Sequence, residues 1–243
     1  QSFIVLTVIT MSGNKELDDL LIDSSSPEQS KEDIQKYLEK KQAAYDALEA
    51  SAPPLERARL QLDVAEALVG SGRADESWEK ARTALDTFIE LEQWQDAVEC
   101  CDVLYQSAQP ASIIALAHGV WLSVTYPVDP TLTVNMLSYV IDETPAKADG
   151  AAVAAVTAHY VADVRAAEDQ HKSLTFLTKQ LLANVAKEHS GVEDQEGLSA
   201  WMERLELLDP DVFLPRLSLV LGAIVPADEW WFDRDALREK IPH

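Results

Sequence analysis

The two cysteines of the chain, Cys100 and Cys101, are adjacent in the stretch LEQWQDAVECCDVL (91–104). Redox and zinc sites usually space their cysteines by two residues, and a structural zinc site needs a second pair of ligands. Neighbouring helical cysteines also point apart, which disfavours a disulfide between them. We therefore predict that both thiols are small apolar core groups on a helix, and the alternative is a reactive or metal-binding thiol.

Histidine supplies the other candidate ligands and bases, but the histidines form no HExxH motif. His118 lies in the apolar stretch LAHGVW, where a hydrogen-bonded core histidine is expected. His159 and Asp163 are four residues apart on one expected helix and should pair with each other. The segment EDQH (168–171) has the Glu-x-x-His spacing of di-iron bundles, but those bundles need two copies. We expect this segment to straddle a helix junction.

Motifs for nucleotide binding and covalent catalysis are missing from the sequence. It contains neither a GxGxxG nor a GxxxxGK[ST] loop, and it contains no GxSxG motif. We therefore predict no catalytic, cofactor-binding or metal-binding residues and no cofactor. A helical-bundle metal protein or enzyme built around His118 and His159 is the alternative from a different functional class.

The net charge of the chain disfavours some classes of partner and favours another. Lys and Arg total 20 and Asp and Glu total 42, which gives a formal net charge of −22. Nucleic acids and anionic membranes attract basic surfaces, so we expect neither as a partner. An acidic surface favours a partner that carries basic residues, and a saline habitat would also explain the excess of acid.

Apolar residues recur at the three- and four-residue spacing of helices along most of the 243 residues, so the predicted fold class is all-α. Asp129-Pro130 and Asp209-Pro210 each combine an N-cap residue with proline at the first helical position. The expected helices span about 30–50, 55–70, 74–91, 94–107, 110–126, 130–141, 149–168, 171–189, 195–208 and 211–225, before a short C-terminal helix.

The N-terminal residues 1–29 are expected to form a flexible segment, because residues 11–30 are acidic and serine-rich. Its short apolar cluster is either a docking peptide or a frayed turn; the cluster consists of Leu17, Leu20, Leu21 and Ile22. Residues 1–10 are apolar and lack a basic start. They either precede a translation start at Met11 or belong to a truncated signal peptide.

The C-terminal residues 227–243 contain three consecutive aromatic residues in DEWWFDRD (228–235). The last helix of a helical array needs a cover over its apolar face. We expect Trp230 or Trp231, Phe232 and Leu237 to provide that cover by packing against the helix at 211–225. The alternative is a patch for docking a partner or for self-association.

Two stretches resemble the tetratricopeptide repeat. In GRADESWEKARTAL (72–85), Gly72 and Ser77 stand at the glycine and small-residue positions of that motif. In EQWQDAVECCDVL (92–104), Trp94 and Ala97 stand at the aromatic and small positions, and Cys100 and Cys101 follow in core positions. The resemblance covers residues 55–108 best. It implies antiparallel helix pairs over 30–226 that stack into a superhelix rather than regular repeats.

The resemblance further implies a groove lined by the first helix of each pair. Residues on the helices concerned include Trp78, Phe88, Trp94 and Tyr105. We therefore expect a non-catalytic scaffold or adaptor of the bacterial cytoplasm that binds a protein or peptide with basic residues. An assembly or maturation chaperone for a partner enzyme is the alternative within the same binding class. The oligomeric state is left open.

Overall fold

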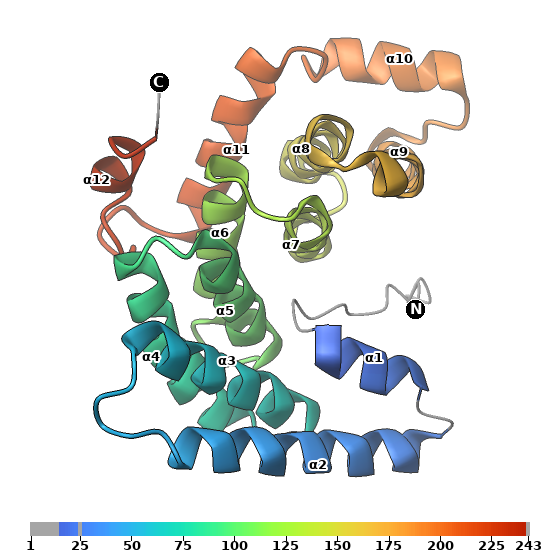
Figure 1. The fold of residues 1–243 in the computed structure, drawn as a ribbon. Helices are drawn as coiled ribbons and strands as arrows, with labels where there is room; N and C mark the ends of the chain where they lie inside the picture. Colours follow the sequence, from blue (N-terminus) through green and yellow to red (C-terminus); the bar gives the residue numbers. More distant parts are fainter. Residues whose placement is uncertain (1–14, 24–25, 242–243) are drawn as a thin grey trace. The chain divides into compact units, whose positions relative to one another are not determined.

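The computed structural model describes residues 15–23 and 26–241, and this part of the chain is a succession of helices (Figure 1). The all-α prediction is confirmed, since the described residues contain twelve helices and no strand. The helices are α1 (Lys15–Asp23), α2 (Pro27–Asp46), α3 (Pro54–Gly70), α4 (Ala74–Glu90), α5 (Trp94–Gln106), α6 (Ser112–Thr125), α7 (Pro130–Glu143), α8 (Asp149–Arg165), α9 (Glu168–Ser190), α10 (Gln195–Arg204), α11 (Pro210–Ile224) and α12 (Arg234–Arg238).

The chain divides into two compact units, Gln1–Ala115 and Leu116–His243. The helical array predicted over 30–226 stays a prediction. The first unit holds α1 to α5 and the second holds α7 to α12, with the boundary inside α6. Among the helices of residues 15–23 and 26–241, none combines the length and the apolar character needed to cross a membrane.

The first unit is a stack of helical hairpins. The helices α2, α3 and α4 each pack against the next helix along the chain, and α3 also contacts α5. Because α3 and α5 touch each other while α4 contacts both, α3 and α5 form neighbouring members of one layer. The packing is close where small residues meet larger ones: Ser77 of α4 is fully buried, and its hydroxyl donates to the carbonyl of Ala65 at 2.7 Å.

The N-terminal region contains regular structure that the sequence did not predict. Helix α1 occupies Lys15–Asp23, and Leu17 is buried in a cluster of apolar residues from α2 and α3. The cluster comprises Leu17, Ile34, Tyr37, Leu38, Val64, Ala67 and Leu68, with Leu20 packed against it. The expectation of a flexible segment is therefore wrong for this stretch. Helix α2 also begins before Ser30, because the hydroxyl of Ser26 caps it by accepting from the N–H of Gln29.

Three turns close their helices in the same way. After α3, the N–H of Arg73 donates to the carbonyl of Leu68, and Gly72 adopts a left-handed φ of 77°. The turns after α4 and α10 contain the same bond between residues five positions apart. The N–H of Gln93 donates to the carbonyl of Phe88, and the N–H of Leu207 donates to the carbonyl of Met202. Their left-handed residues are Glu92 and Glu206, with φ values of 56° and 55°. The geometry matches the motif that usually ends in glycine.

The second unit is organised around α8. This helix packs against α7, α9 and α11, while α10 packs against α9. Figure 1 shows α7, α8 and α9 gathered together, with α10 at the end of the group. Alanines let three neighbours approach α8 closely, and its buried alanines are Ala151, Ala152, Ala154, Ala155, Ala158 and Ala162.

Candidate functional site

The two cysteines lie in the core of the first unit. Cys100 and Cys101 are free thiols with 0% exposure on α5, which confirms the predicted core role. Burial raises the pKa of each thiol above its ordinary value, and the neighbouring Cys101 and Glu66 raise that of Cys100 further. Because the reactive form of cysteine is the thiolate, this environment suppresses thiol chemistry at both positions.

His118 is fully buried on α6 and accepts a hydrogen bond from the C-terminal segment. The backbone N–H of Trp231 donates to Nε2 of His118 at 2.9 Å. The rings of Trp230, Trp231 and Phe232 lie 4.6, 4.5 and 5.0 Å from the imidazole, centroid to centroid. The prediction of a hydrogen-bonded core histidine is confirmed.

The C-terminal aromatic residues contact α6 as well as lying close to one another. Trp121 of α6 lies 6.3 Å from Trp230 and 5.6 Å from Phe232 between ring centroids. The hydroxyl of Tyr126, just after α6, donates to the carbonyl of Leu237 at 2.7 Å. The segment therefore covers an apolar face, as expected, and it contacts the rings of His118 and Trp121 on α6. The expected packing against the helix at 211–225 stays a prediction.

The other predicted histidine interactions differ from the sequence-based expectation. Nδ1 of His159 lies 3.0 Å from the hydroxyl of Thr178, whereas Asp163 lies 3.1 Å from Nε2 of His171. The pairing of His159 with Asp163 is therefore wrong. Helix α9 begins at Glu168, so EDQH forms its first turn instead of straddling a junction. Within residues 15–23 and 26–241, no three His, Cys, Asp or Glu side chains are grouped to hold a metal ion.

The layer formed by α3 and α5 carries two facing rows of acids that the sequence analysis did not single out. Asp63 and Glu66 are on α3, and Asp96, Glu99 and Asp102 are on α5. Residues three apart on a helix share a face, so each row runs along one side of its helix. We call these five residues the acidic seam. Glu66 and Asp102 are only 5% and 4% exposed, so the seam extends into the core.

Carboxylates in the seam are close enough to change one another's pKa. Burial raises the pKa of Glu99 to about 7, and the charges of Asp96, Asp102 and Asp63 add to this effect against a hydrogen bond from Gln95. Burial also raises the pKa of Asp63, and Glu16 and Asp96 contribute to that rise. The seam therefore concentrates negative charge in partly desolvated surroundings, where charge interacts more strongly than in water.

Two basic side chains already contact the seam. Arg59 forms a bidentate pair with Asp96, with nitrogen–oxygen distances of 3.2 and 3.3 Å. Lys41 of α2 donates to Asp63 at 2.7 Å, and Glu16 of α1 also contacts this ammonium group at 3.0 Å. Beside them lies a shallow hollow of about 400 Å³, lined by Pro53, Leu55, Glu56, Arg59, Leu60 and Asp63. The seam thus accepts both guanidinium and ammonium groups.

The aromatic residues predicted near a groove divide into two groups. Phe88 is 0% exposed and cannot reach a partner. Trp78, Trp94 and Tyr105 are half-buried, so part of each ring lies at the surface of the first unit. The position of an aromatic residue in the sequence does not by itself show whether its ring is fully buried or partly exposed.

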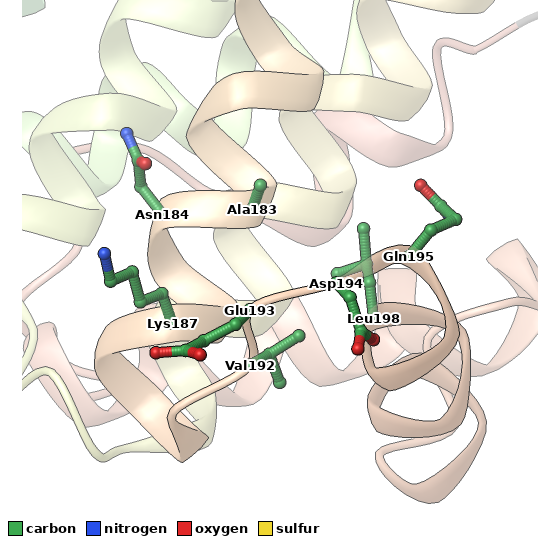
Figure 2. Close-up of a pocket in the computed structure, with 8 residues that line it drawn as sticks. All are labelled: Ala183, Asn184, Lys187, Val192, Glu193, Asp194, Gln195 and Leu198. Carbon is green, nitrogen blue, oxygen red and sulfur yellow. The ribbon is translucent and has the colours of Figure 1, made fainter.

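A second hollow lies between α9 and α10 in the second unit. Figure 2 shows Asn184 and Lys187 on α9, Val192 and Glu193 on the connecting loop, and Leu198 on α10 around this space of about 410 Å³. An adjoining hollow of about 440 Å³ lies beside the same loop. The loop begins with Gly191, whose left-handed φ of 69° ends α9.

Comparisons with protein-family models, with curated proteins and with solved structures gave no match.

Proposed function

We propose that this chain contains a protein-binding module with a tetratricopeptide-like architecture, and that the acidic seam takes a basic segment of a partner protein. The architecture is supported by the hairpin stack of α2 to α5 and by the contact of α3 with α5. In such stacks, alternate helices line the surface that receives a ligand. The seam lies on two such alternate helices.

The observation that carries the proposal is the concentration of five acids on two adjacent helices. Burial is the main cause of the raised pKa values of Asp63 and Glu99, and the neighbouring charge of Asp96 raises both further, so these carboxylates repel one another. A basic side chain placed among them relieves this repulsion and gains charge-assisted hydrogen bonds. The bidentate pair between Arg59 and Asp96 illustrates the geometry that a partner arginine would use.

The cytoplasmic location stays a prediction from the sequence. The bacterial origin stays a prediction.

Binding of a labelled twelve-residue peptide rich in Lys and Arg to the full chain tests the proposal by fluorescence anisotropy. At pH 8.5, where Glu99 with its pKa of about 7 is ionised, the double variant Asp96→Asn/Glu99→Gln should bind about tenfold more weakly, because it removes two charges from the seam. The matched control is Glu79→Gln/Glu90→Gln, which removes the same charge from exposed positions of α4. Affinity should also fall with added salt.

Equal affinities for the two double variants would show that only the net charge of the chain attracts the peptide. Failure of any basic peptide to bind, under conditions where the chain is folded, would reject a basic partner for the seam.

A further inference from the structure

The C-terminal end of α9 brings a hydroxyl, an imidazole and a carboxylate into one hydrogen-bonded line. The hydroxyl of Ser190 lies 2.7 Å from Nδ1 of His189, and Nε2 of His189 lies 3.2 Å from a carboxylate oxygen of Asp149. Asp149 opens α8, whereas His189 and Ser190 close α9. This is the order of groups in a nucleophile–base–acid relay.

Trp201 fixes which imidazole nitrogen carries the proton. Its indole N–H lies 3.2 Å from Nδ1 of His189, and an indole nitrogen can only donate. Nδ1 is therefore the unprotonated nitrogen, and Nε2 carries the hydrogen that faces Asp149. The lone pair of Nδ1 accepts from the Ser190 hydroxyl at 2.7 Å and, at the longer distance of 3.2 Å, from the indole N–H of Trp201. The imidazole thus stands in the tautomer that a general base requires.

Neighbouring groups hold the relay and supply positive charge. Arg216 lies 3.5 Å from the second carboxylate oxygen of Asp149, and Arg204 donates to the Ser190 hydroxyl at 3.1 Å. The His189 side chain is 10% exposed, while Ser190 is at the surface. A guanidinium next to a nucleophilic oxygen favours negative charge on that oxygen and on an adjoining carbonyl oxygen.

Ser190 also opens onto a space of suitable size. The hollow of about 440 Å³ beside the α9–α10 loop is lined partly by small residues, and its lining includes Ser190, Gly191, Gly197, Ala200, Trp201 and Arg204. The adjoining hollow drawn in Figure 2 continues along the loop past Val192. Small lining residues leave room for a short acyl chain next to the hydroxyl.

We propose that Ser190, His189 and Asp149 hydrolyse short-chain carboxylic esters at this site. The Ser190 oxygen bonds to the acyl carbon while its proton passes to Nδ1 of His189, and the carbonyl electron pair moves onto oxygen near Arg204. Collapse of this adduct breaks the ester bond. An alcohol leaves with the proton that the imidazolium returns, whereas an aryloxide leaves as the anion and the imidazolium proton passes to water. Water then attacks the acyl carbon and gives a proton to His189. The bond to the Ser190 oxygen breaks as the imidazolium returns this proton to that oxygen, which releases the carboxylic acid and free Ser190.

This activity is independent of the function proposed for the acidic seam, which lies on α3 and α5 of the other unit. A variant that no longer hydrolyses esters should therefore still bind the basic peptide, and a variant that no longer binds the peptide should still hydrolyse esters.

Hydrolysis of p-nitrophenyl acetate by the full chain, followed by release of nitrophenolate, tests the inference. Ser190→Ala should lower the rate at least tenfold, since a positioned general base and its nucleophile typically contribute 10²–10⁴-fold. Asp149→Asn should lower it as well. The matched controls are Ser199→Ala, an exposed hydroxyl on α10, and His171→Ala, which removes an exposed His–Asp pair of the same unit. Both controls should keep the wild-type rate.

Labelling with a fluorophosphonate gives a second readout that does not depend on turnover, because this reagent bonds to activated serines with loss of fluoride. Peptide mass spectrometry should place the adduct on Ser190, and His189→Gln should abolish it while the melting temperature shows that the variant is folded. An unchanged ester rate in Ser190→Ala, or a fluorophosphonate adduct absent from Ser190 in the folded wild type, would overturn the proposal.

Discussion

The main-chain N–H of Trp231 and the side chain of His118 form a 2.9 Å hydrogen bond between residues that are 113 positions apart in the chain. The bond joins the C-terminal segment to the apolar helix α6, inside a group of aromatic rings. It satisfies a backbone donor that the surrounding rings would otherwise leave without an acceptor, and it thereby fixes where the segment packs.

Replacing His118 with Phe should keep most of the ring contacts but leave the N–H of Trp231 without its acceptor. We expect a loss of about 1–3 kcal/mol in the free energy of unfolding, which urea denaturation followed by tryptophan fluorescence will measure. Trp230→Phe is the control, because its buried indole N–H has no hydrogen-bond partner among the described residues. Its removal should therefore cost less than the His118 change. The reverse ranking would show that the hydrogen bond contributes little.

Leu17→Ala should destabilise the first unit by about 2–4 kcal/mol, because Leu17 is 5% exposed and fills a cluster with α2 and α3. Ile22→Ala, on the same helix but 57% exposed, should change stability by less than about 0.5 kcal/mol. Thermal or urea unfolding of both variants measures the difference. Similar values for the two variants would mean that α1 does not remain packed in solution.

Glu99 should make stability depend on pH near neutrality. Its pKa is about 7 in the folded chain against an ordinary value of 4.5, so the folded state binds the proton more tightly. Stability is therefore highest below pH 4.5 for this group, falls as pH rises through 7, and levels off above it. The shift corresponds to about 3 kcal/mol.

Glu99→Gln removes this titration and should be more stable than the wild type at pH 8, with the gain disappearing towards pH 5. Urea denaturation between pH 5 and 8.5 measures both curves. Glu79→Gln, at an exposed position, should follow the wild-type curve. Parallel curves for Glu99→Gln and the wild type would show that Glu99 ionises normally.

Cys100 and Cys101 should resist modification until the chain unfolds, because both have 0% exposure and burial raises the pKa of each thiol. With a disulfide reagent at pH 8, we expect labelling to follow the unfolding rate and to become immediate in denaturant. Fast labelling of the native chain would indicate that α5 opens locally.

Local signals in the sequence predicted helix positions well where a cap was involved. Asp129 accepts from the N–H groups of Thr131 and Leu132, and Asp209 accepts from that of Asp211, as the Asp-Pro pairs indicated. Helix α1 escaped prediction because its stability depends on burying Leu17 against residues of two other helices. The spacing of apolar residues within such a short helix does not show which residues of other helices it will pack against.

The candidate sites depended even more on tertiary structure. The spacing of Asp96, Glu99 and Asp102 is visible in the sequence as one face of a helix, but the facing row on α3 is not. In the same way, Ser190 and His189 are adjacent in the chain, while Asp149 lies 40 residues earlier. Only the packing of α8 against α9 brings the carboxylate to the imidazole.

The repeated turn after α3, α4 and α10 bears on how relatives of this chain can be found. One of its three left-handed positions holds glycine, and the other two hold Glu92 and Glu206. A left-handed backbone costs glutamate roughly 1 kcal/mol, yet the main-chain hydrogen bonds close the turn in all three cases. What recurs along this chain is thus a pattern of main-chain bonding that different side chains accommodate. Homologues are better sought by that backbone pattern than by a glycine signature.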